Sequence, residues 1–384
     1  MKAIAFYLPQ FHEIPENNEW WGEGFTEWTN MKSSRPLFDG HYQPRVPACG
    51  NYYDLSNVDT IRWQAQLAKD SGLYGWCIYH YWFDGHMLLQ KPMELLLENK
   101  DIDINYCICW ANEDWTNAWV SSESKTLIAQ TYGGEDYWED HFEYLVSFFD
   151  DERYIKQDNK PLLVIYRPEL IPCLNDMLDC WNKLAVEHGY AGLTFAYQHI
   201  NWTRDKNRDE SRFDYAIEYQ PTYAREDMNE GHVSLVRRSK RRLDMFMQRR
   251  FHRQLDFSFL RKARGPEFFS YDDAWEKIIE RKPCSCKSVA GAFVDWDNTP
   301  RRHETGSVCI GASPEKFYRY MRRQIEHVRQ EYSNDYLFIF AWNEWAEGGY
   351  LEPDERYGRG YLDALRRALE DAGELGPVKI ELGC

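Results

Sequence analysis

The chain has 384 residues, a hydrophobic content of 43% and a formal net charge of −16. A chain of this size can bury a large core, and α/β barrels of this length often form one domain. The acidic charge argues against general nucleic-acid binding, because phosphate contacts need a basic surface. We therefore expect one domain over residues 1–384, a ligand that is neutral or is steered by a local charge, and no nucleic-acid partner.

Aromatic residues make up 16% of the chain, with 16 Trp and 26 Tyr. A hydrophobic core accounts for some of these rings. Many of the Trp and Tyr residues, however, stand beside Asn, Asp and Glu, a mixture typical of binding clefts. Aromatic faces stack well on the apolar faces of sugar rings. The composition therefore favours a carbohydrate ligand.

The N-terminal sequence, MKAIAFYLPQF, has no cationic region followed by a long apolar run and a cleavage site. No segment is long and apolar enough to span a bilayer. The ten cysteines are scattered, and the pairs Cys107/Cys109 and Cys284/Cys286 have one intervening residue, which is not a zinc-ligand spacing. We expect a cytoplasmic protein with reduced thiols, no metal and no cofactor.

Eight short apolar runs fit β-strands, and amphipathic stretches separate most of them. The expected strands are Ala3–Leu8, Gly75–Trp82, Ile104–Trp110, Leu162–Tyr166, Leu193–Tyr197, Tyr215–Tyr219, Val289–Val294 and Tyr336–Trp342. The clearest expected helices are Asn57–Ser71, Tyr137–Phe149, Asn175–Glu187 and Pro314–Tyr332. This alternation predicts an α/β fold, a (β/α)8 TIM barrel. A doubly wound open sheet is the alternative, but no Gly-rich phosphate fingerprint follows any strand.

Long βα connections are expected at residues 9–56, 111–136 and 220–270. The last contains a basic helical insertion at about 224–268, with eight Arg and Lys residues between Arg237 and Arg253. One interpretation is a contact with an anionic membrane surface or glycan. The other is a solvated helix that pairs with the acidic excess of the protein.

Polar and aromatic residues follow nearly every expected strand. In a barrel these positions meet in one bowl, at the carboxyl ends of the strands, and a polyhydroxylated ligand needs such groups. The candidate substrate-binding residues are Tyr7, Tyr79, His80, Trp110, Asn112, Glu113, Tyr166, Gln198, Glu218, Tyr219, Asp295, Asp297, Arg301 and Asn343.

The last strand runs into NEWAEGG, where Glu344 and Glu347 lie three residues apart. Two nearby carboxyl groups can divide into an acid and a base, as glycoside hydrolysis requires. The alternative is that they cap the following helix or pair with Arg356 and Arg359. HExxH, GxSxG and HxH-type metal motifs are missing from the sequence, which leaves carboxylate catalysis as the favoured chemistry.

Five segments together resemble the WbsX family, whose members are often labelled glycosyltransferases and occur among polysaccharide genes. The segments are FDGHYQPRVP (38–47), CWANEDWT (109–116), FFDDERYIKQDNKPLLVIYRP (148–168), WDNTPRR (296–302) and AWNEWAEGGYLEPD (341–354). That family is similar to glycoside hydrolase family ninety-nine, the endo-α-mannosidases and endo-α-mannanases.

The resemblance implies a (β/α)8 barrel and a retaining hydrolase without an enzymic nucleophile. It implies that Glu344 removes the proton of the sugar 2-OH, whose oxygen attacks the anomeric carbon to give a 1,2-anhydro sugar. Glu347 is then the acid that protonates the leaving oxygen and needs a raised pKa. The resemblance also implies sugar binding by Tyr7, Tyr166 and the segment 295–301. The first loop, at 19–28 and 38–47, departs from the hydrolase pattern.

Two other functions stay open. The family label implies a glycosyltransferase of cell-surface polysaccharide synthesis. An enzyme that uses a nucleotide sugar usually needs a diphosphate cradle or a metal-binding DxD in a doubly wound domain, and neither is evident. A non-catalytic glycan-binding barrel predicts loss of the carboxyl pair, and both carboxyl groups are present.

Overall fold

Eight parallel strands form a closed barrel in the computed structural model, which describes residues 1–116, 126–200, 209–228 and 265–376. Each strand pairs with the next along the chain, and the first also pairs with the last, which closes the sheet. The barrel strands are β1 (Lys2–Tyr7), β2 (Gly75–Phe83), β4 (Asn105–Trp110), β8 (Lys160–Ile165), β9 (Thr194–His199), β10 (Tyr215–Glu218), β12 (Ser288–Phe293) and β14 (Tyr336–Phe340). The predicted (β/α)8 barrel is confirmed.

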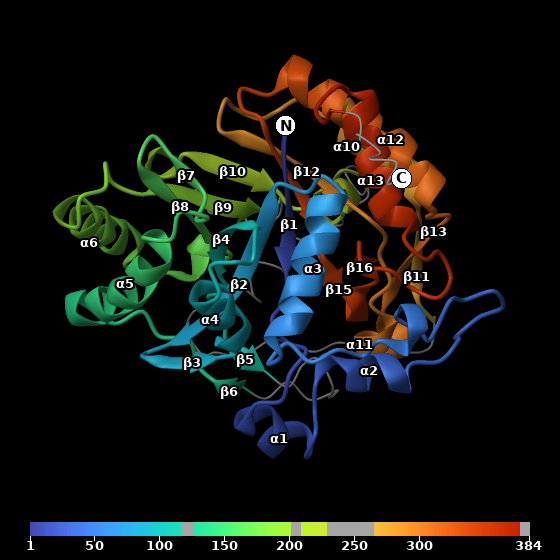
Figure 1. The fold of residues 1–384 in the computed structure, drawn as a ribbon, viewed down its shortest axis with the longest axis horizontal. Coiled ribbons are helices and arrows are strands. Elements are labelled where there is room, and N and C mark those ends of the chain that lie inside the picture. Colours follow the sequence, from blue (N-terminus) through green and yellow to red (C-terminus); the bar gives the residue numbers. More distant parts are fainter. Residues whose placement is uncertain (117–125, 201–208, 229–264, 377–384) are drawn as a thin grey trace, which may run out of the picture.

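Helices surround the barrel, and Figure 1 shows α5 and α6 on one side of it and α10, α12 and α13 on the other. Their N-termini follow local rules: Ser313 precedes Pro314 at the start of α12, and its hydroxyl accepts a hydrogen bond from the Lys316 N–H (3.3 Å). The outer helices are α3 (Val58–Asp70), α4 (Lys91–Glu98), α5 (Glu135–Phe149), α6 (Leu174–Glu187), α7 (Thr222–Met228), α10 (Tyr271–Glu280), α12 (Pro314–Glu331) and α13 (Gly360–Asp371).

The barrel interior is packed with aromatic rings. Phe6 on β1 lies 5.7 Å from the Tyr79 ring, 5.5 Å from the Tyr219 ring and 5.5 Å from the Phe338 ring, measured between centroids. Successive side chains of a strand point to opposite faces. The neighbours of these interior residues therefore point outward, into the helix layer.

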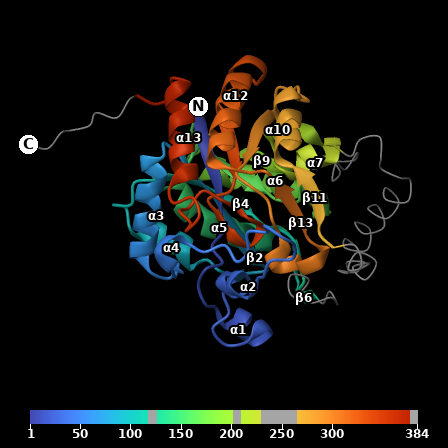
Figure 2. The same cartoon turned by 90° about the vertical axis from the view of Figure 1, so that its right-hand side faces the viewer.

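Short elements lie beyond the carboxyl ends of the strands. Figures 1 and 2 show α1 (Pro15–Trp21) and α2 (Glu27–Ser33) at the end of the barrel toward which β1 points. Figure 1 shows α11 (Thr299–Arg302) and the small hairpin of β15 (Asn343–Glu344) and β16 (Gly349–Tyr350) near the same end. These elements come from the first, seventh and eighth βα connections, and they shape the region above the barrel.

Additional short strands lie in the connections between the barrel strands and the helices. The strand β3 (His86–Leu88) pairs with β2, and β7 (Lys156–Gln157) pairs with β8. Two further pairs are β5 (Trp115–Thr116) with β6 (Thr126–Ile128), and β11 (Glu267–Ser270) with β13 (Ser307–Ile310).

The connection after β10 contains the basic insertion that the sequence predicts. The cluster between Arg237 and Arg253 lies outside the described residues, so its two interpretations stay predictions. Over the described ranges, no helix combines the length and the apolar character needed to cross a membrane.

Candidate active site

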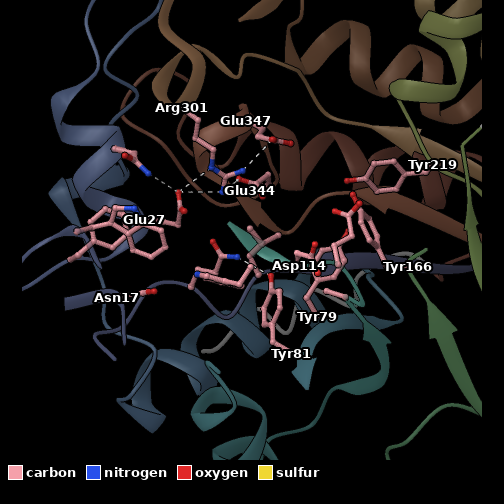
Figure 3. Close-up of a pocket in the computed structure, with 18 residues that line it drawn as sticks. Asn17, Glu27, Tyr79, Tyr81, Asp114, Tyr166, Tyr219, Arg301, Glu344 and Glu347 are labelled. Carbon is pink, nitrogen blue, oxygen red and sulfur yellow. Dashed lines mark hydrogen bonds and ion pairs between the residues drawn. The ribbon is translucent and has the colours of Figure 1, made fainter. Parts of the chain in front are cut away.

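A cavity opens at the carboxyl ends of the barrel strands (Figure 3). Its wall comes from the ends of β1, β2, β4, β8, β10 and β14 together with α1, α2 and α11. Seven of the residues predicted from sequence line it. They are Tyr79, Glu113, Tyr166, Tyr219, Arg301, Glu344 and Glu347.

The β15–β16 hairpin positions Glu344 and Glu347. Asn343 anchors the start of the hairpin to β1, because its side chain accepts from the Leu8 N–H (2.8 Å) and donates to the Leu8 carbonyl (3.0 Å). The Trp345 ring stacks on the Tyr350 ring with centroids 3.8 Å apart. These contacts hold the turn from which both carboxyl groups project.

Arg301 lies between the two carboxyl groups. Its guanidinium nitrogens are 3.1 Å from Oε1 of Glu344 and 3.1 Å from Oε1 of Glu347. Figure 3 shows the three side chains converging on the cavity. The alternative interpretation of the pair is wrong: Glu344 makes no side-chain cap hydrogen bond, and Arg359 pairs with Asp363 instead.

Burial raises the pKa of Glu344 well above its ordinary value, and burial also raises the pKa of Glu347. The Arg301 charge opposes the increase at both groups. Two carboxyl groups that share one cation titrate as a pair, so the pair holds a proton at a higher pH than isolated glutamates do. A site that uses one carboxyl group as an acid and the other as a base needs one of them to keep its proton.

The segment that follows β4 contributes two further acidic residues to the cavity lining, Glu113 and Asp114. Glu113 forms an ion pair with Arg167, which also pairs with Glu169. Asp114 accepts a hydrogen bond from the Gln130 N–H (2.7 Å). Within the described part of the chain, no group of three or more His, Cys, Asp or Glu residues is arranged to hold a metal ion.

Four of the predicted binding residues point away from the cavity, into the helix layer. The Tyr7 hydroxyl donates to Gln64 on α3 (2.7 Å), and His80 Nε2 lies 3.0 Å from His141 Nε2 on α5. The Trp110 ring packs edge-to-face on the Trp181 ring with centroids 5.8 Å apart, and Glu218 accepts from the Tyr332 hydroxyl (2.9 Å). Each follows from strand alternation, since Phe6 and Tyr79 occupy the inward positions next to Tyr7 and His80.

Three more predicted residues serve the framework of the site. Asn112, like Asn343, clamps a backbone: it accepts from the Arg167 N–H (2.8 Å) and donates to the Arg167 carbonyl (2.8 Å). Gln198 lies in the buried barrel interior and donates to the Tyr79 hydroxyl (2.9 Å). Gln198 therefore supports a tyrosine of the cavity wall.

Asp295 and Asp297 do not line the cavity. The first loop holds them: Arg45 pairs with Asp295 (2.8 Å), and His41 Nε2 lies 2.9 Å from Asp297 Oδ2. The Asp297 N–H donates to the carbonyl of Glu347 (2.7 Å). The two aspartates thus fix the segment that carries Arg301 against the hairpin.

Several lining residues were not among the sequence candidates. Most come from the first loop, where no expected strand end pointed to them, whereas Tyr81 and Trp115 lie at or just after expected strands but were not chosen as binding residues. The available signal was an acidic residue between two large aromatic residues, at Phe25–Trp28. The additional residues include Asn17, Trp21, Phe25, Glu27, Asn30, Tyr81 and Trp115.

Comparison with protein families and curated sequences gives clear matches. A family model described as "Glycosyltransferase WbsX" matches residues 3–365. Proteins named "Uncharacterized protein WxcX" from two strains of Xanthomonas campestris pv. campestris are 34% identical over 378 residues. The match covers 97% of this chain and 50% of each relative, so the chain spans about half the length of the curated relatives it matches.

Two solved structures share the fold. The GH99 endo-α-mannosidase from Bacteroides thetaiotaomicron superposes with a TM-score of 0.52 at 14% identity, covering 97% of each chain. A chain described as a glycoside hydrolase-like protein gives a TM-score of 0.51 at 14% identity, covering 96% of this chain and 93% of the other. The similarity extends over nearly the whole barrel.

Proposed function

The chain belongs to the WbsX glycosyltransferase family, and we propose that it is a retaining glycoside hydrolase that cleaves an α-linked, mannoside-like oligo- or polysaccharide. The observation that carries this proposal is the buried pair Glu344 and Glu347, bridged by Arg301 in a cavity lined with tyrosines. A carboxyl pair with raised pKa values, aromatic rings and hydrogen-bonding groups suit the cleavage of a glycosidic bond.

In the proposed first step, the Glu344 carboxylate takes the proton of the sugar 2-OH. The 2-oxygen forms a bond to the anomeric carbon, the glycosidic bond breaks, and Glu347 gives its proton to the leaving oxygen. The product is a 1,2-anhydro sugar. In the second step, Glu347 takes a proton from water and the water oxygen attacks the anomeric carbon. The bond between that carbon and the 2-oxygen breaks, and the 2-oxygen recovers its proton from Glu344. Two inversions give net retention.

The spacing of the two glutamates supports the assignment of the base role to Glu344 and of the acid role to Glu347. The 2-OH and the leaving oxygen sit on neighbouring carbons, so the base and the acid must act within one small region. Arg301 contacts both carboxyl groups and can stabilise whichever one is ionised at each step. The mannoside class follows the activity for which the fold relative is named, a GH99 endo-α-mannosidase.

A glycosyltransferase of cell-surface polysaccharide synthesis is the second candidate, favoured by the name of the family model. The acidic residues of the cavity wall argue against the transferase candidate. Among the described residues that line the cavity, five carry a carboxyl group and Arg301 is the one cation. Such a wall repels the diphosphate of a nucleotide sugar. A non-catalytic glycan-binding barrel is the third candidate, but binding alone gives no role to a buried carboxyl pair.

The test is to incubate the protein with synthetic α-linked aryl glycosides and, separately, with nucleotide sugars. We expect hydrolysis with retention. Glu347→Gln should lose about 10²- to 10⁴-fold in rate on glycosides with poor leaving groups and far less on those with very good ones, because only the former need a proton. Substrates that lack the 2-OH should not be cleaved.

The control for this test is Glu355→Gln, which changes an exposed residue close to the pair in sequence. It should hydrolyse every substrate at the wild-type rate. Transfer from a nucleotide sugar without hydrolysis would replace the proposal with the transferase candidate. Equal losses of Glu347→Gln activity for good and poor leaving groups would remove the acid role from Glu347.

A further inference from the structure

A third carboxyl group contacts the same guanidinium. Glu27 stands in the first turn of α2, and its Oε2 lies 3.2 Å from Nη2 and 3.3 Å from Nε of Arg301. Glu27 is buried and lines the cavity. Figure 3 shows Glu27 and the pair of Glu344 and Glu347 on different sides of Arg301. Arg301 is therefore held by three carboxyl groups that come from two distant parts of the chain.

This arrangement gives Glu27 two effects on the pair. Its contacts occupy the Nε edge of the guanidinium, which orients the remaining N–H groups toward Glu344 and Glu347. Its negative charge also offsets the positive charge of Arg301 at close range, in a site where burial weakens solvent screening. Without Glu27, the full charge of Arg301 would act on the pair.

We propose that Glu27 is a positioning residue of the active site, which holds Arg301 between Glu344 and Glu347 and neutralises its charge so that one of the pair keeps a proton. This inference rests on the proposed function for its catalytic meaning, but the effect on protonation can be measured without a substrate. It assigns a role to the first loop, the region in which the chain departs from the hydrolases it resembles.

The other charged or titratable groups near the pair do not replace Glu27. Arg302 acts on Glu347 from an exposed position, where solvent screens it. Three tyrosines face the pair, and burial raises the pKa of each, so they stay neutral near pH 7. These tyrosines are Tyr81, Tyr166 and Tyr219. The negative charge of Glu27 raises the pKa of both Glu344 and Glu347, whereas Arg301 lowers both.

The test compares the full-length protein with Glu27→Gln, which keeps the shape of the side chain and removes its charge. Glutamate labelled with ¹³C at the carboxyl carbon reports the titration of Glu347 by NMR, with the signal assigned by its loss in Glu347→Gln. We expect the midpoint to fall by on the order of one pH unit, because removing a negative charge favours the ionised form. The pH profile of kcat/KM on an aryl glycoside should move to lower pH by a similar amount.

Two further variants complete the design. Glu304→Gln removes the charge of an exposed ion pair with Arg35 and should leave both readouts unchanged. Glu27→Asp keeps the charge but withdraws it from Arg301, so it should shift the midpoint in the same direction by less. If Glu27→Gln does not fold, Glu27→Asp provides the comparison with wild type.

An unchanged Glu347 midpoint in both Glu27 variants would overturn the inference, as would a loss of kcat/KM that is equal at every pH. If the wild type cleaves no glycoside, the proposed function fails, and the NMR midpoint still decides whether Glu27 controls the protonation of the pair.

Discussion

At the scale of single residues, burial also raises the pKa of a carboxyl group behind the hairpin, that of Glu352. Glu352 accepts hydrogen bonds from the Tyr53 hydroxyl, the Trp345 indole N–H and the Gln64 amide, each at 2.7 Å. Burial raises its pKa from 4.5 to about 7, against the opposing effect of these donors. Glu352 therefore links the Glu344–Glu347 turn to α3 and carries a titration near neutral pH.

The raised pKa of Glu352 predicts that the free energy of unfolding of the protein depends on pH. Its folded-state pKa is higher than its unfolded-state value, so its contribution is fully present below about pH 4.5 and is lost as the pH rises through about 7. Glu352→Gln removes this titration. We expect the free energy of unfolding of the variant, relative to wild type, to increase by on the order of 3 kcal/mol between pH 4.5 and 8.

Urea unfolding at several pH values measures this difference, and Glu355→Gln is the control for a nearby exposed glutamate. A difference between Glu352→Gln and wild type that stays constant with pH would contradict the prediction. In addition to the pH-dependent part, we expect the variant to differ in stability from wild type by an amount that is the same at every pH, because the amide cannot accept all three hydrogen bonds.

At the scale of secondary-structure elements, strand alternation decides which strand-end residues reach the cavity. Tyr79 and Tyr219 face inward and line it, whereas His80 and Glu218 face outward and pack against helices. The inward and outward positions differ by one residue in the sequence. Burial lowers the pKa of His80 to about 3, which keeps the imidazole neutral beside His141. His80 thus stabilises the junction of β2 and α5.

The contact between β10 and β12 depends on Gly291. A Cβ at this position would lie 1.8 Å from the carbonyl oxygen of Glu218, a backbone atom that cannot move without shifting β10. We expect Gly291→Ala to lower the free energy of unfolding by more than about 3 kcal/mol, measured by urea unfolding.

Gly134→Ala is the matched control, because a Cβ there meets no atom within 4 Å and the backbone is in the extended region. It should change the stability by less than about 0.5 kcal/mol. Equal effects of the two substitutions would contradict the steric argument.

At the scale of the whole molecule, the first loop connects the segments that follow the seventh and eighth barrel strands. Arg45 pairs with Asp295, donates to the Gly348 carbonyl (3.2 Å) and lies 3.9 Å from Asp297. One buried guanidinium thus connects three segments that are far apart in the sequence. The position of Arg301, and with it the geometry of the site, depends on this junction.

Arg45→Met should therefore lower the free energy of unfolding by more than the loss of one ion pair would. It leaves two buried carboxylates without their cation, and we expect a loss of about 3 to 5 kcal/mol in urea unfolding. The control is Arg35→Met, which removes an exposed pair between the same loop and Glu304 and should cost less than about 1 kcal/mol. Similar losses in the two variants would show that Arg45 is not the centre of the junction.

Much of the fold was predictable from local patterns. The eight expected strands all occur, within about two residues at most ends, because each is a short apolar run between polar segments. The expected helices at Asn57–Ser71 and Pro314–Tyr332 appear as Val58–Asp70 and Pro314–Glu331, since Asn57 and Ser313 provide N-caps. The TIM barrel follows from counting these elements.

The site was predictable only in part. Glu344, Glu347 and Arg301 stood out because polar residues followed buried strands, and the structure brings their side chains within ion-pair distance of one another. Asp295, Asn112 and Asn343 carry the same local signal but bond to neighbouring segments. A strand-end position alone does not distinguish a residue that faces a ligand from one that secures the framework.

The sequence by itself determined the order of strands and helices, and it marked the carboxyl pair, because hydrophobic periodicity and residue type are local properties of the chain. Only the tertiary structure decided that Glu27 and Arg45 belong to the site, since each acts on partners about 250 or more residues away. Charge pairing in a buried site depends on distances of a few ångströms in space, and these are set when the barrel closes and the first loop docks on it.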